Sequence, residues 1–170
     1  IVTDIPGTTR DAIDTNITYG DYDLTLVDTA GLRKEKNIDN DVEFYSAVRA
    51  DRSLKRSDIS ILVVDAYQGF RKQDANIVNK IFENGNGLII AYNKWDIVES
   101  DRETAQNYID MTVNIYNELK FYPFLFISAK TLRRIGSIFE LATEVYQERK
   151  KSISTEQLNE YFEPIIEEKP

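Results

Sequence analysis

The sequence predicts an α/β fold, in which helices cover both faces of a doubly wound, mainly parallel sheet. Short apolar runs of strand length alternate with longer stretches that have the apolar spacing of amphipathic helices. Polar clusters directly follow three of the apolar runs, at the position where ligands bind in sheets of this kind. The 170 residues, 42% of them hydrophobic, suffice for one packed core, so we expect a single domain.

Four short apolar runs are the expected strands. They are Leu24–Val27, Ile59–Val64, Leu88–Tyr92 and Phe124–Ile127. The last three have the continuous apolar character of buried parallel strands. The first belongs to an antiparallel hairpin, because Asp14–Tyr19 and Tyr22–Val27 flank the tight-turn pair Gly20-Asp21.

Four segments between and after these runs have helical spacing. They are Val42–Arg56, Gln73–Phe82, Thr104–Leu119 and Ile135–Arg149. The stretch Ser152–Pro170 is polar and acidic and places Leu158, Phe162 and Ile165 on one helical stripe. We therefore expect residues 1–151 to form the domain, and residues 152–170 to form a terminal helix and linker.

The composition excludes several classes of site. With no Cys and no His, the chain has no disulfide, no thiolate or imidazole zinc ligand and no Ser-His-Asp triad. A bound metal must accept oxygen ligands, as magnesium does. The net charge of −8 argues against non-specific nucleic-acid binding over the whole surface. No apolar run approaches the roughly 20 residues of a membrane span and no secretion signal is evident, so we expect a cytoplasmic protein without a membrane partner.

The segment Asn93-Lys94-Trp95-Asp96 follows the third apolar run and fits guanine chemistry. A fixed Asp96 carboxylate can accept hydrogen bonds from the ring N–H and the exocyclic amine of guanine, whereas adenine lacks this pair of donors. Sites built on such bonds reject the analogue by roughly 10⁴-fold or more. Lys94 would lay its methylenes on the base plane, and Asn93 would connect neighbouring loops.

The segment Ser128-Ala129-Lys130 follows the last apolar run and completes the expected base site. The Ala129 N–H would meet the guanine carbonyl oxygen, while Ser128 and Lys130 would shape the loop. An isolated Asn-Lys-x-Asp tetrapeptide is more often an ordinary polar loop. Several motifs in this order, each after a strand, make coincidence the minor interpretation.

The run after the hairpin, Asp28-Thr29-Ala30-Gly31, fits magnesium and phosphate chemistry. Asp28 would hold a water of the magnesium shell, and the Gly31 N–H would approach a terminal phosphate without obstruction by a side chain. Taken alone, Asp28 has the alternative interpretation of an ordinary strand-end cap. The similar segment Asp65–Gly69 also follows a strand, and we assign it to turn formation only.

The loop Gly7–Asp11 precedes the hairpin and contains Thr8 and Thr9. A mobile loop at this place would present a threonine hydroxyl to magnesium and a backbone N–H to the terminal phosphate, as a switch does. By itself the sequence Gly-Thr-Thr-Arg is more often a solvated loop, and its value comes from its position.

Three motifs together resemble the EngA (Der) family of ribosome-assembly GTPases. They are Asp4–Asp11, Asp28–Arg33 and Asn93–Asp96. Trp95 and the stretch Ile153–Asn159 resemble the second GTPase domain of that family and its exit. The resemblance implies a three-layer P-loop-GTPase-like fold that binds GTP or GDP with magnesium and hydrolyses GTP. It further implies a preceding GTPase domain, a following KH-like domain and the bacterial large ribosomal subunit as partner.

The resemblance also assigns roles to single residues. Thr9 would be a magnesium ligand, Asp28 would bind a magnesium-bound water, and Asn93, Lys94 and Asp96 would read guanine. Leu32 stands where Ras-like enzymes have the glutamine that orients water, so hydrolysis needs another group, a cation or a partner. Related GTPases use potassium, and the resemblance places backbone carbonyls of the Thr3–Thr8 loop, among them those of Thr3 and Ile5, on that ion.

One motif of the family is not among the 170 residues. The sequence contains no G-x-x-x-x-G-K-[ST], and Gly85-Asn86-Gly87 lacks the Lys and hydroxyl that would follow. The resemblance implies that the first strand, the phosphate loop and the first helix precede Ile1. We therefore expect a fragment of a longer protein, and we expect the stretch by itself neither to bind GTP tightly nor to hydrolyse it.

Two other functions stay open at this point. The first is a non-hydrolysing interaction module, either a degenerate or a truncated GTPase that binds a ribosomal partner. The second is a tRNA-modification GTPase of the MnmE type, which shares the switch sequence. The terminal Cys-containing motif of that family is not in the chain, so the EngA interpretation is preferred.

Overall fold

The computed structural model describes residues 14–27, 51–98 and 102–167, and the fold is given for these residues. The strands are β1 (Thr15–Tyr19), β2 (Tyr22–Leu26), β3 (Ile59–Asp65), β4 (Gly87–Asn93) and β5 (Phe124–Phe126). The α-helices are α2 (Lys72–Glu83), α3 (Arg102–Ile115), α4 (Gly136–Lys150) and α5 (Thr155–Glu167). Two 3₁₀ turns, η1 (Trp95–Ile97) and η2 (Asn117–Phe121), flank α3, and residues 51–56 are also helical.

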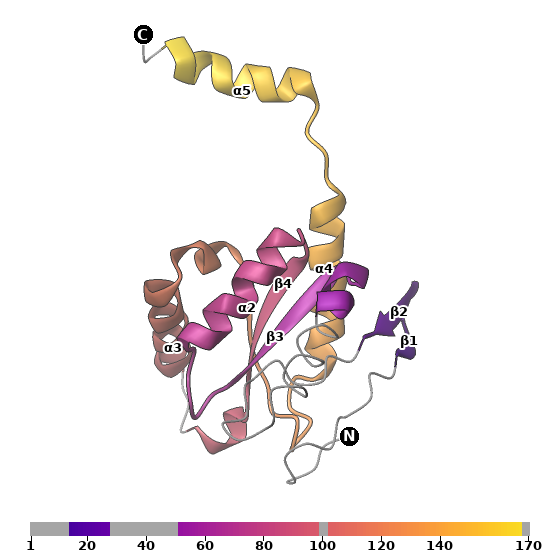
Figure 1. Ribbon diagram of the computed structural model, residues 1–170, viewed down its shortest axis with the longest axis vertical. Helices are drawn as coiled ribbons and strands as arrows, with labels where there is room; N and C mark the ends of the chain where they lie inside the picture. Colours follow the sequence, from indigo (N-terminus) through magenta and orange to yellow (C-terminus); the bar gives the residue numbers. More distant parts are fainter. Residues whose placement is uncertain (1–13, 28–50, 99–101, 168–170) are drawn as a thin grey trace.

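The strands form two sheets (Figure 1). Strands β3, β4 and β5 are parallel, with β4 in the middle, and the register places Asp65 opposite Asn93 at the carboxyl ends of β3 and β4. Strands β1 and β2 form the predicted antiparallel hairpin, whose turn has Gly20 at φ 57°. The alternation of parallel strands and helices confirms the predicted α/β class.

Helices cover both faces of the parallel sheet (Figure 1). On one face, side chains of β3 and β4 pack with α2 and α3 in the main core. Its buried sheet members are Leu62, Val64, Leu88, Ile90, Tyr92 and Phe126, and its buried helical members include Val78 and Ile81 of α2. Partly buried residues of α3, such as Tyr108, pack against it. The other face of β4 lies against α4. Every residue of β4 from Gly87 to Tyr92 is buried, which explains its continuous apolar sequence.

Two sequence predictions need correction in detail. The run Ile59–Val64 does form a parallel strand, but only one face of β3 is buried, and Val63 is 50% exposed on the other. The segment Thr104–Leu119 is not one helix. The backbone of Tyr116 is extended at φ −144°, so the chain divides into α3 and η2 there. The Tyr116 ring packs edge-on against Phe82 of α2, a tertiary contact that local spacing does not encode.

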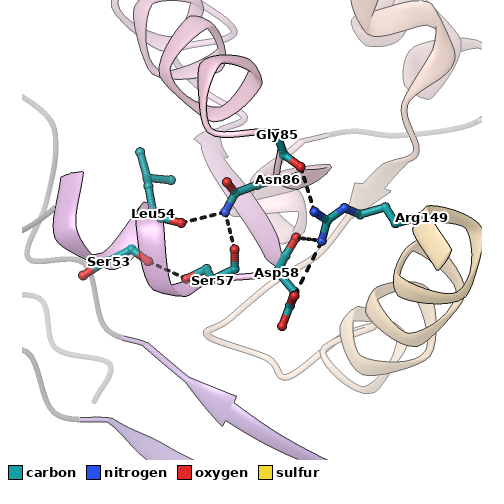
Figure 2. A network of polar contacts seen from close by, with 7 residues as sticks. All are labelled: Ser53, Leu54, Ser57, Asp58, Gly85, Asn86 and Arg149. Carbon is teal, nitrogen blue, oxygen red and sulfur yellow. Dashed lines mark hydrogen bonds and ion pairs between the residues drawn. The ribbon is translucent and has the colours of Figure 1, made fainter.

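A polar network joins the elements at the amino ends of β3 and β4 (Figure 2). The Asn86 amide donates to the carbonyls of Leu54 and Ser57 at 2.9 and 2.6 Å, and Arg149 of α4 donates to the carbonyl of Gly85 at 2.8 Å. Arg149 also donates to the carbonyl of Asp58. The segment Gly85-Asn86-Gly87 thus has a structural role at the amino end of β4, whereas Asn93 lies at its carboxyl end. This role agrees with the lack of phosphate-loop residues in the segment.

The helix α5 projects away from the sheet and follows an extended segment over residues 151–154 (Figure 1). The predicted apolar stripe is present and exposed, with Leu158, Phe162 and Ile165 each 44–45% accessible. The helix continues through Pro164. Among the helices in the described part of the chain, none is both long and apolar enough to cross a membrane.

Candidate functional site

The candidate site lies at the carboxyl ends of the three parallel strands. Strands β3, β4 and β5 run in the same direction, so Asp65 and Asn93, the last residues of β3 and β4, lie at the same end of the sheet as Ser128, which follows β5. Ligands of doubly wound sheets bind at this edge. The structure therefore brings together the two loops that the sequence predicts to read a base, residues 93–96 and residues 128–130.

Asn93 connects these two loops directly. Its side-chain oxygen accepts hydrogen bonds from the Lys94 N–H at 2.8 Å and from the Ala129 N–H at 2.9 Å. An amide oxygen has two acceptor sites, and both are used here. The predicted connection through Asn93 is confirmed. The Ala129 N–H, which we expect to meet guanine, has Asn93 as its partner in this structure, so a ligand would have to share or replace that bond.

The backbone of Lys94 is held in a conformation that is rare for residues with a side chain. Its φ is 67°, in the left-handed region. A non-glycine residue in this region costs about 1 kcal/mol or more, so the conformation persists only where surrounding contacts hold it. Residues of this kind are concentrated at ligand sites. Here both the backbone and the side chain of the next residue, Trp95, are held in place. The Trp95 N–H donates to the carbonyl of Ile127 at 3.0 Å, and the Trp95 side chain is only 4% exposed.

An aromatic cluster beneath the loop fixes Trp95. The centroid of its ring lies 5.0 Å from that of Tyr108, in an edge-on arrangement, and 4.3 Å from that of Phe126. The Tyr108 hydroxyl donates to the carbonyl of Ala66 at 2.9 Å, which connects the cluster to the turn after β3. In the sequence, Trp95 is only a mark of resemblance, and its role as the anchor of the loop comes from the structure.

Asp96 is exposed and its charge is stabilised. A hydrogen bond with Ser128 lowers the pKa of the Asp96 carboxyl below its ordinary value, and the positive charge of Lys130 acts in the same direction. At neutral pH, Asp96 is therefore an accessible carboxylate. Ser128 is fully buried, and its hydroxyl accepts a hydrogen bond from the Thr131 N–H at 3.1 Å, so it shapes the loop as predicted. Lys130 is exposed.

The structure adds Asp65 to the site. Its carboxylate forms an ion pair of 2.8 Å with the Lys94 ammonium and accepts the Tyr67 N–H at 2.9 Å. Burial raises the pKa of Asp65, but the hydrogen bonds from Lys94 and the Tyr67 N–H outweigh it and leave the pKa lowered. The turn assigned from the sequence is confirmed, because the Asp65 carbonyl accepts the N–H groups of Gln68 and Gly69. The position of Asp65 after an apolar run is visible in the sequence, as it is for Asn93, but it does not by itself show the ion pair with Lys94.

A cavity of about 1080 Å³ runs along β3, between the hairpin and α4. Its walls are mainly apolar side chains of β2, β3 and α4, and Asp65, Asn93 and Lys94 line it as well. Neither Asp96 nor Ala129 lines the cavity. The predicted base-reading residues therefore lie on the two loops, and only Asn93 and Lys94 among them line this cavity.

Six other predicted site residues lie outside the described residues. They are Thr3, Ile5, Thr8, Thr9, Asp28 and Gly31. Within residues 14–27, 51–98 and 102–167, no cluster of carboxylates is arranged to hold a metal ion. The magnesium and potassium assignments therefore remain predictions.

Sequence comparisons show which proteins the chain is similar to. The family model described as "50S ribosome-binding GTPase" matches residues 1–94. GTPase Der of Chlorobium phaeobacteroides (strain BS1) is 43% identical over 170 residues, which is 100% of this chain and 39% of the relative. GTPase Der of Caldanaerobacter subterraneus subsp. tengcongensis is 46% identical over 159 residues, 94% of this chain and 36% of the relative. The chain thus spans about two fifths of the length of these relatives.

Solved structures show the same fold. Era, in complex with MgGDPNP and nucleotides of 16S ribosomal RNA, has a TM-score of 0.71 at 22% identity over 91% of this chain and 49% of Era. A probable GTP-binding protein engB has a TM-score of 0.61 at 20% identity, over 86% of this chain and 87% of that protein. These likenesses confirm the predicted P-loop-GTPase-like architecture.

The match to the family model covers 94 residues from the switch motifs to Lys94. The named relatives extend the similarity through the rest of the chain, which confirms the resemblance to EngA (Der) that the motifs indicated. The chain belongs to the family of 50S ribosome-binding GTPases.

Proposed function

We propose that this chain is the guanine-nucleotide-binding part of a cytoplasmic GTPase that takes part in assembly of the large ribosomal subunit. The family description and the Der relatives support this function. The observation that carries it is the hydrogen bond between Asn93 and Ala129, which brings the two base-reading loops together at the edge of the sheet where nucleotides bind.

The proposed base recognition uses three groups. The ionised Asp96 carboxylate accepts the ring N–H and the exocyclic amine of guanine, both charge-assisted hydrogen bonds. The Lys94 methylenes form an apolar surface against the base plane. The Ala129 N–H binds the guanine carbonyl oxygen, and the Asn93 oxygen keeps the Lys94 N–H as a partner when the Ala129 N–H is shared with the ligand.

The proposed phosphate recognition uses residues from the segments before and after the hairpin. Thr8 and Thr9 contact the terminal phosphate and magnesium, Asp28 holds a magnesium-bound water, and the Gly31 N–H binds the terminal phosphate. Magnesium, when bound, neutralises the phosphate charge that develops during hydrolysis. Leu32 cannot orient the attacking water, and the backbone carbonyls of Thr3 and Ile5 would instead hold potassium near it.

We also propose a domain arrangement. Residues 1–151 form a GTPase domain that corresponds to the second of the two GTPase domains of EngA. Residues 152–170 form the helix and linker that lead to a KH-like domain. A preceding GTPase domain would make the complete protein a tandem repeat. The exposed α5 and the extended residues 151–154 are consistent with a connection of this kind.

Nucleotide binding tests the base site. In the natural polypeptide that carries these residues, titration calorimetry should show GDP binding and no measurable ADP binding. Asp96→Asn should weaken GDP binding by about 30-fold, because a charged acceptor becomes an amide that faces donors. The same variant should bind xanthosine diphosphate more tightly than the parent, since a carbonyl replaces the amine of guanine.

The control is Asp110→Asn, which changes an exposed carboxylate on α3 that accepts a hydrogen bond from Gln106. Its GDP affinity should equal that of the parent. Equal GDP affinity in Asp96→Asn and the parent would exclude this base site.

Co-sedimentation with purified 50S subunits, combined with GTP turnover in potassium and sodium buffers, tests the ribosomal function. We expect nucleotide-dependent binding to the 50S subunit and faster turnover in potassium. Subunit binding without any turnover would instead identify the non-hydrolysing module.

A further inference from the structure

The side chain of Lys94 is fixed at both of its ends. At the backbone, the residue follows the end of β4 in the left-handed conformation, held by the Lys94 N–H bond to Asn93. At the tip, the ammonium lies 2.8 Å from a carboxylate oxygen of Asp65 at the end of β3. Asp65 and Asn93 are register partners in neighbouring strands. The four methylenes therefore extend across the edge of the sheet from one strand to the next.

We propose that Asp65 is a positioning residue of the guanine site, which holds the Lys94 stem extended as a flat surface for the base. This inference rests on the proposed function, because it concerns the same site. Asp65 does not contact the base in this assignment. It acts through Lys94, whose long side chain would otherwise move among many rotamers and lose that freedom when the base binds.

Asp65 itself is well placed to act as a fixed anchor. Its side chain is 11% exposed, whereas that of Lys94 is 57% exposed, so the anchor is the less mobile partner of the ion pair. One carboxylate oxygen accepts the Tyr67 N–H and the other meets Lys94. The turn beyond it is tied down by the Tyr108 hydroxyl, which donates to the Ala66 carbonyl. Tyr108 also packs against Trp95 of the guanine loop, so the anchor and the loop share one support.

The ion pair also gives the Lys94 ammonium a counter-charge within the site. An unpaired Lys94 ammonium would be drawn to any nearby phosphate or carboxylate and would leave the base plane. With Asp65 as partner, the ammonium has a local counter-charge, and the stem is the part of the side chain left to contact a ligand. Asp65→Asn removes the charge and leaves an amide oxygen for the Tyr67 N–H, so the turn is retained.

A double-mutant cycle separates this role from a purely structural one. Its variants are Asp65→Asn, Lys94→Met and the double substitution, all in the natural polypeptide that carries the chain. Met keeps an apolar stem without an ammonium. We expect Asp65→Asn to weaken GDP binding about fivefold when Lys94 is present and less than about twofold when Met replaces it. Fluorescent-nucleotide titration measures all four affinities.

Two further measurements complete the test. The ratio of GDP to IDP affinity should stay the same in Asp65→Asn, because IDP lacks only the amine that Asp96 reads. Asp58→Asn, an exposed carboxylate at the other end of β3, should bind GDP as the parent does. Thermal unfolding checks that each variant folds. If Asp65→Asn is unfolded, Asp65→Ser takes its place in the cycle, because a serine hydroxyl also accepts the Tyr67 N–H.

The outcomes distinguish this inference from the function on which it rests. A parent protein that does not bind GDP contradicts the proposed function. A parent that binds GDP, together with unchanged binding by Asp65→Asn, contradicts only the role of Asp65. An equal loss of affinity in the Lys94 and Met backgrounds shows that Asp65 acts through the turn alone, and it also overturns the inference.

Discussion

The side-chain oxygen of Asn93 accepts the backbone N–H of Ala129 at 2.9 Å, although the two residues are 36 positions apart in the chain. This bond joins the loop after β4 to the loop after β5. The same oxygen accepts the Lys94 N–H at 2.8 Å, so one side chain fixes both the strained residue and the neighbouring loop. Asn93 therefore supports the site through the backbone of both loops.

Replacing Asn93 with Ala should separate the two loops. The Lys94 and Ala129 N–H groups would lose their partner, which should lower the free energy of unfolding by about 1–2 kcal/mol and GDP affinity by about tenfold. Urea denaturation and nucleotide titration measure the two effects. The exposed Asn114→Ala on α3 is the matched control and should change neither quantity. Unchanged GDP binding by Asn93→Ala would show that the bond does not organise the site.

Truncation of Trp95 should destabilise the domain and disorganise the guanine loop. The ring is 4% exposed and packs between Tyr108 and Phe126, so Trp95→Ala should cost about 3–5 kcal/mol of unfolding free energy. Trp95→Phe should cost less, because part of the aromatic contact remains. Denaturation followed by circular dichroism measures the loss. Tyr161→Ala, at a 68% exposed position of α5, should stay within about 0.5 kcal/mol of the parent.

Acid should weaken the fold through Asp65 and Asp96. Both carboxyls have a pKa below the ordinary value of 3.8. Burial raises the pKa of Asp65, but its hydrogen bonds, of which the one from Lys94 is the strongest, outweigh this effect. A hydrogen bond with Ser128 lowers the pKa of Asp96. A carboxyl with a lowered folded pKa stabilises the fold above its unfolded pKa, and this contribution is lost as the pH falls through the folded value. Their contributions should thus be constant between neutral pH and about pH 5 and decline below about pH 4.

Denaturation of the parent and Asp65→Asn across this range isolates one of the two groups. The stability difference between the two proteins should be largest at neutral pH and shrink below about pH 4, since a protonated Asp65 carboxyl is neutral, as is the amide that replaces it in the variant. A difference that grows as the pH falls would contradict the direction of the Asp65 shift.

Gly87 should not accept a side chain. A Cβ at this position would lie 2.5 Å from Cδ1 of Ile59 and 2.7 Å from Cγ1 of Val145, where β4 meets α4. Gly87→Ala should therefore lower the unfolding free energy by about 1–3 kcal/mol through overpacking. Gly136→Ala at the start of α4 is the control, because among the described residues, apart from its chain neighbours and the nearby backbone of its own helix, no heavy atom lies within 4 Å of the added Cβ. A neutral Gly87→Ala would show that α4 can move away from β4 at little cost.

Much of the fold follows from local sequence patterns. The apolar run Leu88–Tyr92 predicts β4 because a strand buried on both faces needs apolar residues at consecutive positions. The Gly20-Asp21 turn predicts the hairpin, and the spacing over Gln73–Phe82 predicts α2 to within a residue at each end. The division between α3 and η2 could not be predicted in this way, since Tyr116 leaves the helical conformation where its ring meets Phe82 of another helix.

The sequence by itself determined which residue types stand at the carboxyl ends of the strands. The order of Asn93, Lys94 and Asp96 after an apolar run, with Ser128-Ala129-Lys130 after the next, predicts guanine recognition, because residue type and position relative to a strand are local properties. The tertiary structure alone decided which side chains support these residues. The pairing of Asp65 with Lys94 and the packing of Tyr108 on Trp95 join residues 29 and 13 positions apart, and such contacts depend on how strands and helices pack in space.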